Sequence, residues 1–376
     1  MTRARTLVTG FPSSFLARRV VRKLLATEPK GLITCVVQGK FEARARAAIE
    51  ELDPSEHKRI ELLEGDIAAM DLGLSGKEFR ELARDVEVIH HCAAITYLGA
   101  DKRTAEHVNV GGTREVVELA EAATALSRLV HWSTAQVSGA RRGYVLEGEL
   151  IAQSGFRNAI EETRFRAERI VREASTRVPA TVLRPATIVG DSRTGEIDRF
   201  DGPYLLVQLL LSAPSELRMP MPGRGDVPLN LVPIDFVVDA GCAIARDARS
   251  VGRTFHLVDP HPLTTRGVFE RIAQEAGRPM PRGSVPTRVA AALLRAPGLN
   301  QLTSAPRAFL EQLGTEVVYD GRNTSELLAN TGIQCPPFES YVAPLVDAVR
   351  RQHAARRAQV ASELEALPDQ EDPLFD

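Results

Sequence analysis

The chain has 376 residues, 44% of them hydrophobic, and its 47 lysine and arginine residues nearly balance its 49 aspartate and glutamate residues. A formal net charge of -2 argues against a general nucleic-acid binder and against a membrane-surface protein. The length allows a large core and predicts one large domain that carries a smaller lobe.

The cysteine usage and the N-terminal sequence favour a reducing, cytoplasmic location. The four cysteines are far apart and form no CxxC pair, so neither a disulfide framework nor a metal site is indicated. Arg3 and Arg5 lead directly into a strand pattern, without the apolar segment of a signal peptide. The longest apolar runs, such as "PYLLVQLLLSAP", are too short to span a membrane.

Short β-rich apolar runs alternate with amphipathic helical patterns over the first half of the chain. The predicted strands are residues 5–10, 32–38, 59–65, 86–94, 126–134 and 179–185. The predicted helices between them are residues 15–27, 41–52, 76–84, 104–123 and 159–175. This strict alternation predicts an α/β fold with a doubly wound, Rossmann-like parallel sheet and helices on both of its faces.

After about residue 190 the pattern loosens into loops rich in glycine and proline. The elements predicted there are a strand at 254–259 and helices at 203–212, 235–247, 264–276, 286–295 and 340–366. We assign residues 1–190 to the first domain, with 227–260 returning to it, and residues 191–350 mainly to a smaller lobe. Residues 351–376 are expected to form the end of the last helix and a flexible acidic tail. The lobe is expected to close over the carboxyl ends of the strands and to supply the substrate pocket.

The segment "TGFPSSFLA" joins the first strand to the first helix. A dinucleotide-binding loop needs one glycine for its tight turn, a second for approach of the pyrophosphate, and a third, or an alanine, for packing of helix on strand. Gly10 supplies the first. With standard spacing, Ser13 and Leu16 take the other two places, and leucine is too large to pack closely. With one extra residue in the loop, Ser14 and Ala17 take them, and this second reading is favoured.

Ser13 or Ser14 is also expected to cap the helix, which leaves amide groups and a hydroxyl near a phosphate. The loop is thus compatible with a dinucleotide-binding domain over residues 1–190. Taken alone, however, a strand, a turn with two serines and a helix would equally fit a purely structural loop.

Several motifs in order carry a resemblance to a known family. They are "EGDI" at 64–67, "VIHHCAA" at 88–94, "NVGGTREVVELA" at 109–120, "HWSTAQVSG" at 131–139 and "LRPATIVGDSRTG" at 183–195. With them the chain resembles an extended short-chain dehydrogenase/reductase. "DGPYLLVQLLL", "NLVPIDFVVDA" and "TFHLVDPHPLT" further resemble the thioester-reductase and fatty-acyl-CoA-reductase branch, which has the male-sterility NAD-binding domain. The resemblance covers residues 5–350.

The resemblance implies where the cofactor lies. Asp66 and Ile67 would flank the adenine, Ala93 and Ala94 would let the cofactor approach a strand end, and Asn109 would brace the active site. The implied cofactor-binding residues are Thr9, Gly10, Pro12, Ser13, Ser14, Phe15, Leu16, Lys40, Asp66, Ile67, Cys92, Ala93, Ala94, Asn109, Arg164, Pro185, Thr187 and Ile188. The alternative is that the alanines only pack a helix and that Asp66 is a turn residue.

The choice of cofactor depends on the end of the second strand, where an acid would bind the ribose hydroxyls and a basic residue the extra phosphate. The sequence there is "VVQGKFEARAR", with no acid directly after the strand and with Lys40 and Arg44 close by. This favours NADPH, with NADH as the alternative. Both basic residues would also fit the exposed start of a helix.

The catalytic positions depart from the family. Short-chain reductases use a tyrosine for proton transfer, a lysine four residues later, and a serine or threonine that orients the substrate oxygen. Thr134, three residues before Val137, fits the hydroxyl position. The segment "NAIEETRFRAERIV" places Ile160 at the tyrosine position and Arg164 at the lysine position. Isoleucine has no ionisable proton, and a guanidinium with a pKa above about 12 cannot relay one.

Three other proton sources are open. Tyr97, and after it Tyr204, could enter the site, water held by Thr134 could donate, or the substrate could carry its own acidic group. Tyr97 would equally fit a pocket-lining aromatic. Ser133, Gln136 and Tyr204 are predicted to face the substrate.

Two functions follow. The first is an NAD(P)H-dependent reductase of a carbonyl or thioester on an apolar acyl, polyketide-like or secondary-metabolite substrate, working without the usual tyrosine and lysine. The second is a non-redox member of the fold, either a binding or regulatory protein or an isomerase or cyclase that uses the same pocket. The partner is a small molecule, neither nucleic acid nor a membrane, and a homodimer is the family-level expectation.

Overall fold

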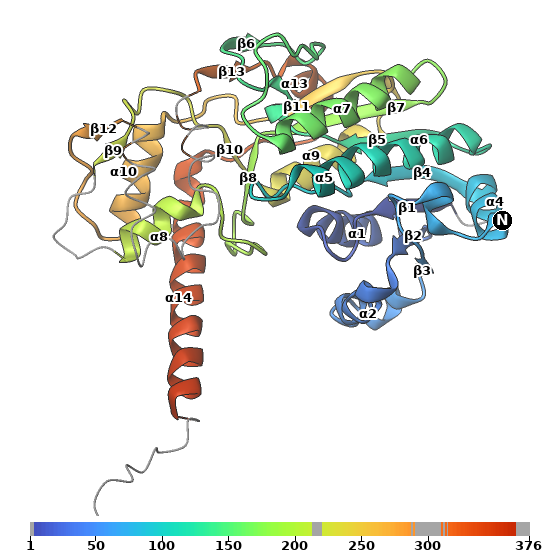
Figure 1. Cartoon of the computed structure of the whole chain (residues 1–376), viewed down its shortest axis with the longest axis horizontal. Helices are drawn as coiled ribbons and strands as arrows, with labels where there is room; N and C mark the ends of the chain where they lie inside the picture. The colour runs from blue at the N-terminus through green and yellow to red at the C-terminus, as the bar shows by residue number, and fades with distance from the viewer. Residues whose placement is uncertain are drawn as a thin grey trace, which may run out of the picture.

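The computed structural model describes residues 4–212, 220–286, 289, 310, 313 and 315–365. Its centre is a seven-stranded sheet with the order β11-β7-β5-β4-β1-β2-β3, in which all neighbours are parallel (Figure 1). The strands are β1 Arg5–Thr9, β2 Leu32–Val37, β3 Ile60–Glu64, β4 Val86–His91, β5 Arg128–Trp132, β7 Ala180–Pro185 and β11 Thr254–Leu257. The predicted α/β class and parallel sheet are confirmed.

Helices cover both faces of this sheet because successive side chains on a buried strand point to opposite sides. Val8 packs with α1 (Phe15–Thr27) and α9 (Ile234–Arg246). Its neighbour Leu7 packs on the other face with α4 (Gly76–Asp85), α6 (Gly112–Ala122) and α7 (Ala159–Ala174). The same alternation holds along β5 and β7, and it produces the doubly wound architecture.

The remaining elements of this domain are short. They are the helices α2 Glu42–Glu50, α3 Pro54–His57 and α5 Lys102–Ala105, the π-helical turn Glu106–Gly111, and the 3-10 turns Gly39–Phe41, Met70–Gly73, Ala135–Ser138 and Ala248–Ser250. The single helix predicted over 104–123 is therefore a composite of α5, the π-helical turn and α6. Such π-helical turns are frequent at functional sites.

A second hydrophobic core builds the smaller lobe. It lies among β8 (Thr187–Val189), β10 (Leu231–Pro233), α8 (Tyr204–Ser212), α10 (Thr265–Glu275) and the first half of α14 (Val342–Glu365). In Figure 1 the second half of α14 extends away from the body. The strands β9 (Met221–Pro222) and β12 (Ser284–Val285) pair at the rim of the lobe.

Part of the segment predicted as lobe lies against the sheet domain instead. Strand β13 (Val317–Tyr319) pairs with β6 (Gly143–Val145), and α13 (Arg322–Leu328) packs on β11 and α9. Most of the predicted helix 286–295 and the tail after residue 365 lie outside the described residues. In the part of the chain that the structure describes, no helix is both long and apolar enough to cross a membrane.

Candidate active site

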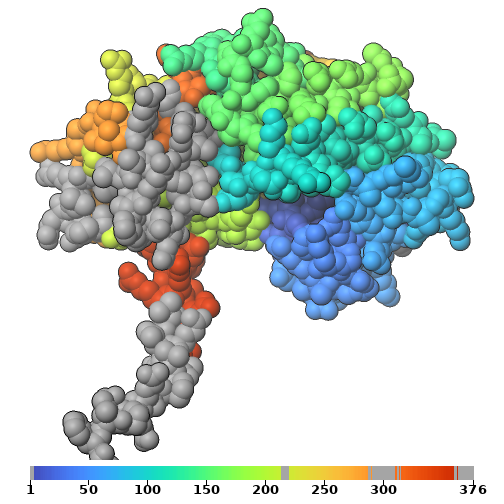
Figure 2. All heavy atoms as spheres, viewed as in Figure 1, coloured from blue at the N-terminus to red at the C-terminus, as the bar shows by residue number. Residues whose placement is uncertain are grey.

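The strand order reverses its direction of winding between β1 and β4, which is the place where open α/β sheets bind their ligands. Gly10 follows β1 with φ at +92°, and a Cβ on it would lie 2.9 Å from the Cα of Ala93, just beyond β4. Only glycine fits both this backbone conformation and this close approach. In Figure 2 the surface is hollowed over α1, in dark blue, between α5 in cyan and the segment near residue 200 in yellow-green.

The loop after Gly10 has the longer of the two predicted spacings. Ser14 caps α1, because its Oγ accepts a hydrogen bond from the amide of Ala17 at 3.2 Å. Ala17 is fully buried on the sheet, as predicted for the packing position, and Leu16 is partly buried against the same core. Ser13 is exposed at the tip of the loop. The amides of the first turn of α1 therefore face the crevice between β1 and β4.

The ends of β1 and β4 are joined by a chain of hydrogen bonds through His91. The Ala93 amide donates to Thr9 Oγ1 at 3.2 Å, and Thr9 Oγ1 lies 2.8 Å from His91 Nδ1. On the other side, His91 Nε2 lies 2.9 Å from Thr113 Oγ1, which donates to the Asn109 carbonyl. Since Thr113 uses its only proton there, His91 Nε2 carries a proton and donates to Thr113. Burial lowers the pKa of His91 to about 3, so the ring is neutral at neutral pH and its Nδ1 accepts from Thr9.

Asn109 braces the loop that follows β4. Its Oδ1 accepts from the Ile95 amide at 2.7 Å, and its Nδ2 donates to the Ile95 carbonyl and to Thr163 Oγ1 at 3.0 Å. Asn109 is buried within the π-helical turn. The side chain thus connects the segment with Ala93 and Ala94 to α7, directly beside Arg164.

The hydroxyl groups after β5 separate into two environments. Thr134 is half-buried, and its Oγ1 accepts from the Gln136 amide at 3.3 Å. Within the described part of the chain its hydroxyl donates to no other group, which leaves the proton for a ligand. Gln136 Nε2 in turn reaches Thr187 Oγ1 at 3.4 Å, which connects the ends of β5 and β7. Ser133 was predicted to face the substrate, but it is buried and donates to Glu168 at 2.6 Å. The structure thus brings Thr134, Gln136 and Thr187 together and turns Ser133 inward.

The first turns of α7 hold neither the tyrosine nor the lysine of the family pattern. Ile160 is 5% exposed, and Arg164 is equally buried, with Nη2 donating to the carbonyl of Trp132. Burial lowers the pKa of Arg164 to about 10, while Glu168 opposes the shift, so the guanidinium stays charged at neutral pH. A fixed positive charge consequently lies directly beneath the strand end that carries Thr134.

The five tyrosines of the chain differ in burial and in the groups that their side chains contact. Tyr204 was predicted near the substrate, but it is buried in the lobe core, where its hydroxyl accepts from the Gly190 amide at 2.7 Å. Tyr341 donates to the Leu231 carbonyl, and Tyr144 is exposed on β6. Tyr97, after β4, is half-buried with its ring against Gly99 and under the guanidinium of Arg199.

The fifth tyrosine, Tyr319, lies near the start of α7 by an unexpected route. Its hydroxyl is 3.4 Å from Ser138 Oγ, at the end of the turn that Thr134 begins. The sequence signal for it was absent, because β13 reaches this place only by pairing with β6. Burial raises the pKa of Tyr319, so the phenol keeps its proton at neutral pH.

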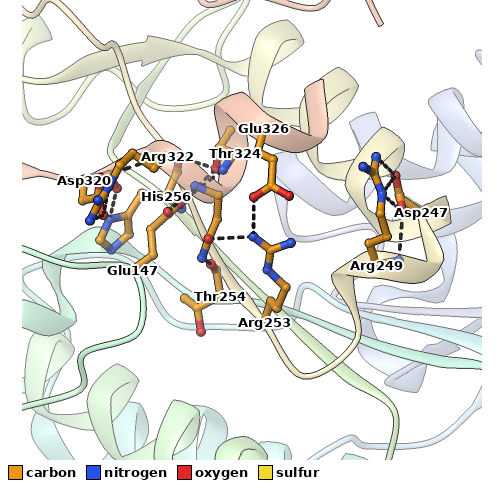
Figure 3. A network of polar contacts seen from close by, with 11 residues as sticks. Glu147, Asp247, Arg249, Arg253, Thr254, His256, Asp320, Arg322, Thr324 and Glu326 are labelled. Atoms are coloured by element: carbon orange, nitrogen blue, oxygen red, sulfur yellow. Dashed lines mark hydrogen bonds and ion pairs between the residues drawn. The ribbon is translucent and has the colours of Figure 1, made fainter. Parts of the chain in front are cut away.

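A buried network lies behind this site and holds α13 to the sheet (Figure 3). Glu147 accepts from the His256 amide at 2.9 Å and from Thr324 Oγ1 at 3.1 Å. His256 Nδ1 lies 2.6 Å from the Asp320 carbonyl, and Arg184 Nη1 lies 3.2 Å from its Nε2. Because the guanidinium can only donate, Nε2 accepts and Nδ1 carries the proton. Burial lowers the pKa of this neutral His256 to about 4.

The predicted adenine site lies at the ends of β2 and β3, where an open cleft of about 490 Å³ is lined by Gln38, Gly39, Glu64, Gly65, Asp66, Gly73 and Glu78. Asp66 Oδ1 accepts from the Ala68 amide at 3.0 Å, so this oxygen serves a turn, whereas Oδ2 accepts from no group in the described ranges. Ile67 packs over Gly112 of α6. Glu64, within the "EGDI" motif, was not predicted as a site residue. Pro185 and Ile188 border the end of β7, where β8 begins.

Three relatives show what the chain is similar to. Glycine betaine reductase ATRR from Emericella nidulans is 30% identical over 71% of this chain and 22% of that protein. One of the subunits of linear gramicidin synthase from Brevibacillus parabrevis is 28% identical over 90% of this chain and 7% of that protein. Fatty acyl-CoA reductase wat from Drosophila melanogaster is 26% identical over 62% of this chain and 53% of that protein. The chain thus spans little more than half of these relatives at most.

Among solved structures, the terminal R domain from the myxalamid PKS-NRPS biosynthetic pathway superposes with a TM-score of 0.79 at 25% identity, covering 94% of this chain and 92% of that one. The reductase domain of a nonribosomal peptide synthetase from Mycobacterium tuberculosis shares the fold, with a TM-score of 0.68 at 21% identity and coverage of 92% and 91%. Residues 8–241 match the NAD-binding family described as male sterility protein. Since this match covers more than half of the chain and the crevice between β1 and β4 is intact, the chain belongs to the male sterility protein family of NAD-binding domains, whose relatives include thioester and fatty acyl-CoA reductases.

Proposed function

We propose that the protein is an NAD(P)H-dependent reductase of a carbonyl or thioester group on an apolar acyl or polyketide-like substrate. One observation carries the proposal. The ends of β1, β4 and β5 combine a backbone crevice at Gly10 and Ala93 with the Thr134 hydroxyl, which donates to no group among the residues that the structure describes. The relatives named as a glycine betaine reductase and a fatty acyl-CoA reductase support the same reaction class.

The residues present fit a dinucleotide. The crevice at Gly10 is one that a Cβ would fill, and the capped N-terminus of α1 directs amides towards a pyrophosphate. A bound nicotinamide would supply the hydride. Thr134 donates a hydrogen bond to the oxygen of the carbonyl and holds it in place, and the charge of Arg164 beneath the strand end favours the developing negative charge on that oxygen.

Proton supply differs from that of the family, because Ile160 cannot donate and Arg164 holds its proton too tightly. We propose Tyr97 as the donor, since it lies in the loop that follows β4 and its ring is half-buried under the guanidinium of Arg199. Tyr204 and Ser133 take no part in this proposal because both hydroxyls are buried in hydrogen bonds.

A second function is favoured by the first turns of α7. Ile160 fills the tyrosine position with an apolar side chain, and Arg164 is bonded to the Trp132 carbonyl. These features equally suit a protein that binds the cofactor or a small molecule without redox turnover.

Cofactor titration followed by turnover separates the two functions. The full chain is titrated with NADH and with NADPH, using nicotinamide fluorescence. It is then incubated with a panel of acyl thioesters, aldehydes and ketones of increasing chain length while cofactor oxidation is recorded. The reductase requires binding below millimolar concentration and steady oxidation with at least one substrate. Binding without oxidation supports the second function, and absence of binding contradicts the reductase.

A further inference from the structure

The cleft at the ends of β2 and β3 is lined by acidic residues, and this negative charge affects whether NADH or NADPH binds there. In doubly wound folds the ribose of the adenosine half lies at the end of the second strand, and an acid there binds its hydroxyls. The residues that line the cleft include three acids, Glu64, Asp66 and Glu78, and neither a lysine nor an arginine.

Glu64 reaches the end of β2 from the neighbouring strand. It is the last residue of β3, where it lies opposite Val37 in the parallel register. Its Oε1 is 2.7 Å from the point where a Cβ on Gly39 would lie, which is closer than real Cβ atoms approach. Glycine at position 39 therefore leaves room for the carboxylate directly over the end of β2.

Of the three carboxylates in this cleft, that of Glu64 accepts no hydrogen bond from another described residue. Glu78 accepts from the amide and the hydroxyl of Ser75 at 2.9 and 2.5 Å in a capping box. Asp66 uses one oxygen for its own turn. Among the described residues, none donates a hydrogen bond to either oxygen of Glu64, which is exposed to the cleft.

The two basic residues from which NADPH was predicted lie outside this lining. Lys40 is exposed, with Nζ 5.0 Å from the ring centre of Phe41 in the same turn. Arg44 is exposed on α2. Neither is among the side chains around the cleft, so a 2′-phosphate placed there would meet carboxylates first.

We infer that Glu64 performs from β3 the task that other members of this fold give to an acid at the end of β2. It accepts hydrogen bonds from the ribose hydroxyls and repels a 2′-phosphate, so the protein binds NADH in preference to NADPH. This inference rests on the proposed function, because it requires that a nicotinamide dinucleotide binds. It also replaces the sequence-based prediction of NADPH.

The test compares the dissociation constants of NADH and NADPH for the full chain, measured by nicotinamide fluorescence at fixed ionic strength. We expect NADH to bind at least tenfold more tightly. Glu64→Gln, which keeps the shape and removes the charge, should reduce that preference by about tenfold. Lys40→Ala should leave it unchanged, and so should the matched control Glu81→Gln on the exposed face of α4. Because Glu64 is exposed, the variant should unfold at the wild-type temperature.

The outcomes are separable. Tighter or equal binding of NADPH by the wild type overturns the inference and leaves the proposed function standing. An unchanged preference in Glu64→Gln, or a loss of NADPH binding in Lys40→Ala, also overturns it and returns the selection to the basic residues. If neither cofactor binds, the proposed function fails and the inference fails with it.

Discussion

The crevice between β1 and β4 and the first turns of α7 depart in different ways from the pattern that the sequence resemblance implies. In the crevice, serine and alanine stand where glycines are usual, yet Ser14 caps α1 and Ala17 packs fully buried on the sheet. At α7 the backbone is equally regular, but Ile160 and Arg164 cannot perform the proton transfer of a tyrosine and a lysine.

This difference separates two kinds of requirement. The role of a glycine in the loop is steric, and a small residue can meet it wherever the backbone angle is ordinary. Gly10, with a positive φ and the close approach to Ala93, is the loop glycine that is kept. The role of the tyrosine is chemical, and no side chain without a suitable proton can meet it. Cofactor binding and proton transfer therefore place different demands on the side chains of such a site.

The largest expected effect is a loss of stability at low pH. It concerns the crevice because His91 joins the ends of β1 and β4. Burial lowers the pKa values of His90, His91 and His256 to about 4, 3 and 4. As the pH falls, the histidines of the unfolded chain take up protons near pH 6.5, whereas those of the folded chain stay neutral. The free energy of unfolding is therefore highest above pH 6.5 and decreases as the pH drops towards the folded pKa values. Through these three histidines together, the free energy of unfolding should decrease by about 4 kcal/mol between pH 7.5 and pH 5.5.

Urea unfolding at the two pH values measures this loss. His131, whose pKa burial also lowers, acts in the same direction. Glu147 and Glu161 act in the opposite direction, because burial raises their pKa values. Equal stability at pH 7.5 and 5.5 would contradict the burial of His90, His91 and His256 as neutral side chains.

The next effect breaks the crevice itself. In Gly10→Val, a Cβ would lie 2.9 Å from the Ala93 backbone at a φ of +92°, so the loop must move. We expect more than 100-fold weaker binding of the cofactor in a fluorescence titration. Gly148→Ala is the matched control, because a Cβ there meets nothing within 4 Å. Unchanged binding in Gly10→Val would show that the cofactor does not use this crevice.

How far the sequence predicts these features depends on their range in the chain. The packing of Ala17 was predictable, because it depends on the size of residues within one loop. The π-helical turn at Asn109 was not, because its side chain bonds to Ile95 and Thr163 on other segments. The same holds for Ser133, which is turned inward by Glu168 on α7, 35 residues further along the chain.

The site was less predictable than the fold for the same reason. Alternating apolar runs determine which strands form the sheet, but not which side chain reaches across from a neighbouring strand. Glu64 lies over Gly39, and Tyr319 lies beside Ser138, only because β2 pairs with β3 and β6 with β13. Lys40, in contrast, was predicted from closeness in sequence alone.

The third prediction concerns the hydroxyl at the end of β5. Thr134→Val removes the proton that holds the substrate oxygen and should lower kcat about 100-fold, since loss of one such donor typically costs 10² to 10³. Cofactor binding should stay within twofold of the wild type. Thr134→Ser, which restores the hydroxyl, should recover most of the rate. An unaffected kcat in Thr134→Val would remove this residue from the reaction.

The smallest expected effect tests Tyr97 as the proposed proton donor. Tyr97→Phe should lower kcat about tenfold, less than a full general acid contributes, because water held by Thr134 can take over part of the transfer. Tyr319→Phe deletes the same group from a half-buried ring that lies 5.4 Å from the His256 ring, and it should leave kcat unchanged. The opposite pattern would place the donor on β13, beside Ser138. The proton would then come from a segment that lies more than 150 residues beyond Ile160 in the chain.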